Sequence, residues 1–382
     1  MVTDMNLLIS PRLPAATAVL SAVVLAALVA LPARAADTRQ ESPNNKGVVE
    51  LETGSSTGIS VRIAEDLANI VDDGSTRRVL PVVGKGALQT ITDLKVLHGI
   101  DIAIVPTDVL DYARQQKLYP GLESSLTYIT KLYNEEFHLL ARQDIKSIAD
   151  LANQTVNVDL RNSGTAVTAG KLFGLLKISV TPANDDQAVA LEKLRKGQIA
   201  ALAFVSGKPA PIFRGIVGTE GLHFISVPLR PEITAAYVPT RLTGSDYPGL
   251  VSQDQPVDTI AVGTALVVAP LTPYSDRYRN VANFVDTFFT QFQGLLEPGH
   301  HAKWSEVNLA ADFPGWRRFP PADEWLKRNT SPAVALKPQD LRAIFSRFID
   351  ERQQATGGQP MTQQQKDDLF GQFERWQGGQ LH

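Results

Sequence analysis

Cysteine is absent from this chain of 382 residues. Its absence excludes disulfide bonds, thiolate zinc sites, iron–sulfur clusters and a cysteine nucleophile. An excess of one charge is missing as well, because 37 Lys and Arg residues stand against 40 Asp and Glu residues, a net charge of −3. Such a mild and mixed charge is poorly suited to nucleic acids, whose phosphates require basic surfaces. We therefore expect no nucleic-acid partner.

Histidine is scarce too, with six residues in the chain. His300 and His301 follow Pro298-Gly299, which is typical of an exposed turn, and no acidic residue lies at ligand spacing. His98 precedes Gly99 at the end of an expected helix, where histidine is a common capping residue. We expect no metal site and no cofactor.

The N-terminal region contains the longest uncharged apolar run. Residues Ala15–Leu31 carry no charge and are followed by "LPARAAD", in which Ala33 and Ala35 fit the small-x-small rule for signal cleavage. We predict that residues 1–35 form a signal peptide, cleaved after Ala35, and that the protein is periplasmic. The alternative is an N-terminal membrane anchor, for which a run of about 17 residues is at the lower limit.

Two parts of the chain repeat one order of elements. "VVELETGSSTGISVRIAEDLANIV" (48–71) and "TVNVDLRNSGTAVTAGKLFGLL" (155–176) each read as an apolar strand, a Gly/Ser/Thr loop and an amphipathic helix. Residues 87–114 and 186–213 then each read as a helix, a buried strand and a turn. This order predicts an α/β fold of two similar lobes with parallel strands, unless two generic strand–helix–strand units resemble each other by chance.

The polypeptide chain is expected to cross from one lobe to the other twice. "FHLLAR" (137–142) reads as a strand that leaves the first lobe, and "TIAVGTALVVAP" (259–270) as the strand that returns. Two crossings make a hinge with a cleft between the lobes. The boundaries predicted in this way are lobe 1 at 47–140 plus 264–297, lobe 2 at 141–263, and a mostly helical extension at 298–382. All four tryptophans lie in that extension, which either docks on the first lobe or contacts a membrane partner.

Both Gly/Ser/Thr loops precede helices and are candidate anion sites. The first turn of a helix has unpaired backbone N–H groups and a partial positive charge, and small residues let an anion approach them. Hydroxyl groups add further donors, and they come from Ser55, Ser56, Thr57, Ser163 and Thr165. Ligands of open α/β sheets bind beyond the carboxyl ends of the strands, where these loops fall. The alternative is that the hydroxyls only cap the helices.

The first loop also matches G-x-S-x-G, the nucleophile elbow of serine hydrolases, through Gly54, Ser56 and Gly58. Its strand–turn–helix context fits. Its position does not, because only about 20 residues of the cleaved chain would precede Ser56, whereas the elbow follows several strands. No histidine stands in a recognisable catalytic setting. We expect no enzyme and keep a serine hydrolase using Ser56 as an alternative.

The sequence resembles the TAXI-type solute receptors of TRAP transporters, which have the type II periplasmic binding-protein fold. The segments that carry the resemblance are "TGSSTG" (53–58), "GIDIAIVPTDV" (99–109), "NSGTAVTAGKLF" (162–173), "FVSGKPAPIF" (204–213), "DYPGL" (246–250) and "VDTIAVGTALVVA" (257–269). A departure from the family is "GISVRIA" after the first loop, where aromatic residues are usual.

The resemblance implies a monomeric receptor that captures a small anionic or zwitterionic solute, an organic acid or amino acid, and delivers it to membrane permease subunits. A sensor component with the same fold is an alternative. The ligand-binding residues that the resemblance implies are Ser55, Ser56, Thr57, Gly58, Thr107, Asp108, Ser163, Gly164, Thr165, Ser206 and Gly207.

Overall fold

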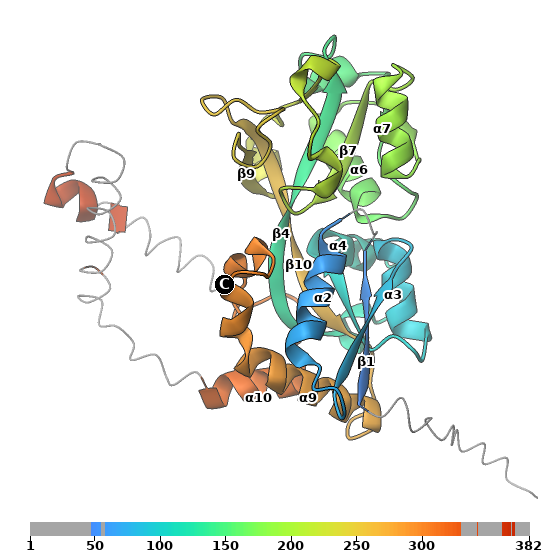
Figure 1. Cartoon of the computed structure of the whole chain (residues 1–382), viewed down its shortest axis with the longest axis vertical. Coiled ribbons are helices and arrows are strands. Elements are labelled where there is room, and N and C mark those ends of the chain that lie inside the picture. The colour runs from blue at the N-terminus through green and yellow to red at the C-terminus, as the bar shows by residue number, and fades with distance from the viewer. Residues whose placement is uncertain (1–46, 55–57, 330–341, 343–360, 368, 371–382) are drawn as a thin grey trace, which may run out of the picture. The chain divides into compact units, whose positions relative to one another are not determined.

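A computed structural model describes residues 47–54, 58–329, 342, 361–367 and 369–370 of the chain (Figure 1). The predicted signal peptide and Trp376 lie outside the described residues. The strands are β1 (Val48–Thr53), β2 (Arg78–Val83), β3 (Ile102–Pro106), β4 (Thr127–Arg142), β5 (Thr155–Asn157), β6 (Thr181–Ala183), β7 (Ala201–Ser206), β8 (Leu222–Phe224), β9 (Val238–Leu242) and β10 (Val257–Val268). They form one ten-stranded sheet in the order β2-β1-β3-β10-β4-β7-β5-β6, with β8 beside β4 and β9 beside β10.

Helices cover both faces of this sheet. They are α2 (Ser60–Val71), α3 (Ala87–Val96), α4 (Thr107–Gln115), α5 (Leu122–Ser125), α6 (Gly164–Leu176), α7 (Gln187–Arg195), α8 (Pro231–Thr234), α9 (Asp276–Thr290) and α10 (Pro320–Asn329). Short 3₁₀ turns include η2 (Ile148–Leu151), η3 (Pro211–Phe213), η4 (Gly218–Glu220), η5 (Phe292–Leu296) and η6 (Ala302–Glu306). Within the described residues, none of the helices has the length and apolar character needed to cross a membrane.

The first half of the molecule is built on β1, β2 and β3, which pair in parallel. Side chains alternate along β3, so Ile102 and Ile104 pack with α2 and α9 while Ala103 and Val105 pack with α3 and α4. The predicted strand, loop and helix at 48–71 are β1 and α2.

The second half is built on β5, β6 and β7, which also pair in parallel. Along β7, Ala201 and Ala203 pack against α6, and Leu202 and Phe204 pack on the opposite face with α7. The predicted strand, loop and helix at 155–176 correspond to β5 and α6. The α/β fold class with two similar βαβ units is therefore confirmed.

The two halves are joined through β4 and β10, which pair antiparallel with each other. β10 pairs with β3 through residues 264–268, and β4 pairs with β7 through residues 136–141. The predicted lobe boundaries fall within these two strands and stay a prediction. In the middle of β4 lie two adjacent acidic residues, Glu135 and Glu136, and both are buried.

Residues 298–329 of the extension pack on the first half. Trp304 is buried against Phe288, with ring centroids 6.0 Å apart, and its Nε1 donates to Asp66 Oδ2 of α2 at 2.9 Å. Trp316 stacks on Phe313 at 5.5 Å. The described part of the extension thus takes the docked position, the first of its two predicted roles.

Candidate functional site

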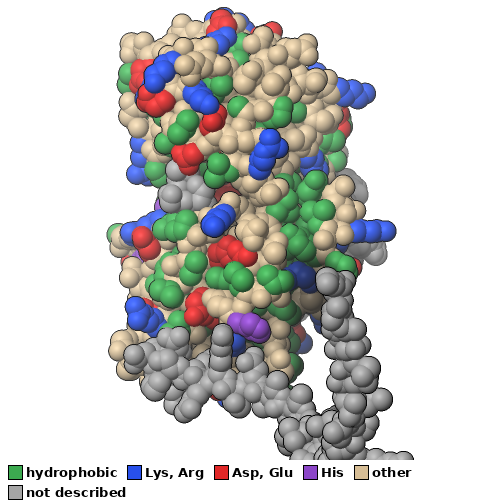
Figure 2. Space-filling model, turned by 90° about the vertical axis from the view of Figure 1, so that its right-hand side faces the viewer, with side chains coloured by type: hydrophobic (Ala, Val, Ile, Leu, Met, Phe, Trp, Pro, Cys, Tyr) green, Lys and Arg blue, Asp and Glu red, His purple; other side chains and the backbone are tan. Residues whose placement is uncertain are grey.

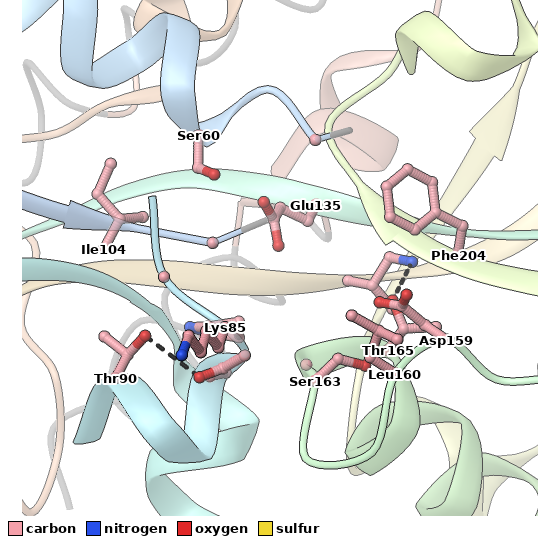
Figure 3. Close-up of a pocket in the computed structure, with 18 of the residues that line it drawn as sticks. Ser60, Lys85, Thr90, Ile104, Glu135, Asp159, Leu160, Ser163, Thr165 and Phe204 are labelled. Atoms are coloured by element: carbon pink, nitrogen blue, oxygen red, sulfur yellow. Dashed lines mark hydrogen bonds between the residues drawn. The ribbon is translucent and has the colours of Figure 1, made fainter. Parts of the chain in front are cut away.

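A cavity of about 410 Å³ lies between the two halves, within the usual range of small-molecule sites (Figure 3). The first half contributes Gly54, Gly58, Ser60, Val83, Gly84, Lys85, Gly86, Ala87, Thr90, Ile104 and Pro106, and the second contributes Asp159, Leu160, Ser163, Gly164, Thr165, Asp186, Phe204 and Val205. The joining strands add Glu135 and Thr264. Because both halves line the cavity, any motion of one half against the other changes its volume.

The start of α6 faces this cavity from the second half. Ser163 is the N-cap, and its side chain accepts a hydrogen bond from Ala166 N at 3.1 Å. Gly164 N and Thr165 N donate to no other described residue, and both residues line the cavity. Thr165 Oγ1 accepts from Val205 N at 3.0 Å and so ties α6 to β7. The Ser163 hydroxyl therefore caps the helix, while backbone N–H groups remain for a ligand.

The start of α3 faces the same cavity from the first half. Gly86, the N-cap, has φ = +143°, a conformation that side chains rarely adopt. A Cβ on Gly86 would lie 3.1 Å from Asn162 O, and Leu88 N donates to that same oxygen at 3.1 Å. This hydrogen bond joins the two halves beside the cavity. Two helix starts, one from each half, therefore meet at the site.

Acidic side chains are more numerous in the lining than basic ones. The lining contains the carboxyl groups of Glu135, Asp159 and Asp186, whereas Lys85 is its one basic residue in the described part of the chain. Figure 3 shows the Glu135 carboxyl group in the space between Ser60 and the residues of the second half. Elsewhere, charges of both signs are interspersed over the face in Figure 2.

Burial shifts the protonation of these acids. It raises the pKa of Glu135 to about 8; the neighbouring Glu136 raises the pKa as well, and the Lys303 ammonium lowers it. Burial also raises the pKa of Asp159 to about 6. Behind Thr90, Glu52 is buried with Oε1 accepting from the Thr90 hydroxyl at 2.8 Å, and burial raises the pKa of Glu52 to about 7. The charge of the cavity wall therefore changes near neutral pH.

Comparison with known proteins identifies the family. The sequence model of the NMT1-like family matches residues 51–294. The chain belongs to the NMT1-like family. This family is of the periplasmic binding-protein type, and with the mixed sheet it shows a type II periplasmic binding-protein fold.

Solved structures similar to this NMT1-like protein include solute-binding proteins of low sequence identity. The periplasmic binding protein BugD is 15% identical, with a TM-score of 0.45, over 74% of this chain and 93% of that one. The alkanesulfonate-binding protein SsuA from Xanthomonas axonopodis pv. citri, bound to MOPS, is 14% identical, with a TM-score of 0.40, over 80% of this chain and 93% of that one. A TctC solute-binding protein from Polaromonas is 15% identical, with a TM-score of 0.37, over 64% of this chain and 88% of that one.

Four of the predicted site residues of this NMT1-like protein line the cavity. They are Gly58, Ser163, Gly164 and Thr165. Three more, Ser55, Ser56 and Thr57, lie outside the described residues.

The remaining four predicted residues lie behind the cavity wall. Thr107 and Asp108 do not form a turn after β3 but begin α4, and Asp108 Oδ2 accepts from the Thr168 hydroxyl of α6 at 2.7 Å. Ser206 is fully buried at the end of β7. Gly207 is packed so closely that a Cβ would lie 2.2 Å from Ile59 Cδ1. Asp108 and Gly207 thus contact the opposite half, and none of the four residues lines the cavity.

Several lining residues were missed by the sequence analysis. Glu135, Asp159, Asp186 and Phe204 stand in or after strands, where no hydroxyl-rich loop marks them. The segment "VGKGA" (83–87) did contain a signal, since Gly84 and Gly86 lie between a strand and a helix. In this NMT1-like protein that segment places Lys85 beside the cavity.

The joining strand β4 is also held by the extension. Glu136 Oε1 accepts from Lys303 Nζ at 2.7 Å, and Glu136 Oε2 accepts from Lys208 N of the second half at 2.9 Å. Lys303 Nζ also donates to Glu306 Oε1 at 2.7 Å. Glu306 Oε2 in turn accepts from Asn134 N at 3.0 Å. The segment 134–136 is therefore fixed on both sides.

Among the described residues, no three His, Asp or Glu side chains are grouped to hold a metal ion. His138 is fully buried, with Nε2 accepting from the Tyr247 hydroxyl at 2.7 Å and Nδ1 donating to Phe204 O at 3.3 Å. Burial lowers the pKa of His138 to about 3. Its imidazole is therefore neutral and engaged in packing contacts of the second half.

Proposed function

We propose that this NMT1-like protein is an extracytoplasmic receptor that captures a small solute with a carboxylate group in the cavity between its halves and delivers it to a TRAP-type membrane transporter. One observation carries the proposal: two helix starts from opposite halves, at Gly86 and Gly164, meet at one cavity of about 410 Å³. Periplasmic binding proteins close by hinge motion around such a ligand.

The carboxylate is best accommodated at the start of α6. Gly164 N and Thr165 N donate to no other described residue, and the positive end of the α6 dipole lies there. Lys85 of the opposite half lines the same cavity and adds the positive charge that a carboxylate prefers. The anionic end of the solute is therefore held between the halves.

Contacts across the cavity describe a closed arrangement. Leu88 N donates to Asn162 O at 3.1 Å, and the Thr168 hydroxyl donates to Asp108 Oδ2 at 2.7 Å. Both contacts must break for a solute to enter from the side of α3 and α6. We expect β4 and β10 to bend during that opening, because they are the strands that join the halves.

Delivery to a transporter is supported by the sequence resemblance to TAXI-type receptors, and export by the predicted signal peptide. The test is co-purification of the mature protein with the permease subunits in the presence of solute. Co-purification with a sensor kinase instead would favour the alternative of a sensor component.

Solute binding itself is tested with a thermal-shift panel of small carboxylic acids and amino acids, since a ligand that binds only the folded protein raises its Tm. Gly164→Ala should weaken binding of the best solute by about tenfold, or roughly 1.4 kcal/mol, because the added Cβ would lie 3.2 Å from Pro106 Cγ of the opposite half.

Gly170→Ala is the matched control, because it lies on the same helix with nothing within 4 Å of an added Cβ. We expect calorimetry to show wild-type affinity for this variant. Equal affinities of the two variants would contradict a site at the start of α6.

A further inference from the structure

The Glu135 side chain lacks a strong hydrogen-bond partner among the residues that the structure describes. It is 9% exposed, it lines the cavity, and its one hydrogen bond to a described residue is a long one, from the Tyr133 hydroxyl to Oε1 at 3.4 Å. Oε2 accepts from no described residue. A carboxyl group that is nine-tenths buried and faces a cavity with only a long hydrogen bond to a described residue costs free energy, so a ligand that supplies a partner would be favoured.

The remaining charges around Glu135 are mostly negative. Asp159 and Asp186 line the cavity from the second half, and Asp108 and Glu136 lie close enough to affect Glu135 electrostatically. The basic groups are Lys85 in the lining and Lys303 behind β4. Lys303 is already paired with Glu136 and Glu306, so it supplies no free partner for Glu135.

We propose that Glu135 determines which solutes the cavity accepts, by pairing with a positively charged ammonium group of the solute, and that Lys303 and Glu306 of the C-terminal extension position it. This inference rests on the proposed function. The solute would have its carboxylate at the start of α6 and its ammonium group toward β4.

The positioning role follows from the alternation of side chains along β4. Glu135 faces the cavity, so its neighbours Asn134 and Glu136 face the other side of the strand. There Lys303 donates to the Glu136 side chain at 2.7 Å. Glu306 in addition accepts from the backbone N–H of Asn134 at 3.0 Å. Residues 302–306 lie beyond the segment 51–294 that the family model matches, so this support is an addition to the family's part of the chain.

The test pairs each of the common L-amino acids with the carboxylic acid that lacks its α-amino group, for example L-glutamate with glutarate and L-leucine with 4-methylpentanoate. Calorimetry with the mature protein should show at least about tenfold tighter binding of the amino acid in the pair that binds best. Glu135→Gln should remove that difference and leave the affinity for the deaminated acid within about twofold. Glu123→Gln, on the exposed face of α5, is the control and should change neither.

The pH dependence separates this role from a merely structural one. Because Glu135 must be ionised to hold an ammonium group, affinity for the amino acid should rise between pH 6 and pH 8, through the raised pKa of about 8. Lys303→Met removes the group that lowers this pKa, so the rise should move to higher pH, and Lys303→Arg should restore it. Melting curves confirm that each variant is folded.

Three results would overturn the inference. Equal binding of both members of every pair, or affinity for the amino acid that falls as the pH rises, would show that Glu135 does not hold a cation; in either case the proposed function would survive. Binding of no member of any pair would overturn the proposed function as well.

Discussion

The two halves of the molecule share one architecture and differ in the chemistry that they bring to the cavity. Among the described residues, the first half contributes Gly54, Gly58, Gly84 and Gly86 together with one basic residue, Lys85. The second contributes the carboxyl groups of Asp159 and Asp186 and the ring of Phe204, and each half adds two hydroxyl groups from its described residues. A repeated strand–helix order therefore fixes where helix starts and backbone N–H groups lie. The side chains, which do not repeat, decide what each half contacts.

The difference extends to stability, because the described part of the extension packs its tryptophans on the first half. Trp304→Ala should lower the free energy of unfolding by about 3–5 kcal/mol, since a buried indole is lost and Asp66 loses a hydrogen bond. Urea denaturation measures the change. Tyr274→Ala, at a side chain that is 83% exposed, should stay within about 0.5 kcal/mol of wild type. Similar small losses for both would mean that the extension does not stabilise the first half.

A buried acid of the first half, Glu52, makes the stability of this half depend on pH. The pKa of Glu52 is raised to about 7 by burial, so ionisation favours the unfolded chain as the pH rises from about 5 to 8. Glu52→Gln removes that titration. The stability of the variant relative to wild type should therefore increase by about 2–3 kcal/mol over this range. Urea titrations at pH 5 and pH 8 check the difference, and an unchanged difference would show that Glu52 is not protonated in the folded protein.

The second half is tested at the contact between α6 and β7. Thr165→Val leaves the buried Val205 N–H without its acceptor and should cost about 1–3 kcal/mol of unfolding free energy. Thr219→Val, at an exposed position of η4, is the control and should be near neutral. If both variants unfold alike, the hydroxyl of Thr165 is free for the solute, and its loss should then appear as weaker binding.

Much of the fold could be predicted because local sequence patterns mark its strands and helices. The Gly/Ser/Thr loops mark where β1 and β5 end and where α2 and α6 begin, and the apolar "FHLLAR" marks β4. Local patterns are misleading at Ser147, since "SIADLAN" (147–153) is typical of a capped helix start, whereas Ser147 caps only the 3₁₀ turn η2. That turn ends at Leu151, and β5 begins at Thr155.

The candidate site was less predictable, because its side chains are assembled by tertiary contacts. Glu135 and Glu136 look alike in the sequence, and only the pleat of β4 decides which faces the cavity. Thr107 and Asp108 follow a strand end, as ligand-binding residues often do, yet the packing of α4 on α6 turns Asp108 to Thr168. A prediction from hydroxyl content alone therefore assigns ligand binding to too many residues that follow strand ends.

The tryptophans of the docked extension are intrinsic fluorescence probes. Residues 141–263 contain no tryptophan, whereas Trp304, Trp316 and Trp325 all lie on the first half. Indole fluorescence therefore reports the surroundings of the extension and is insensitive to rearrangements confined to the second half. Because Trp304 is adjacent to Lys303, which donates to Glu136 of β4, a change of the Trp304 emission on adding a solute would report a change at this contact.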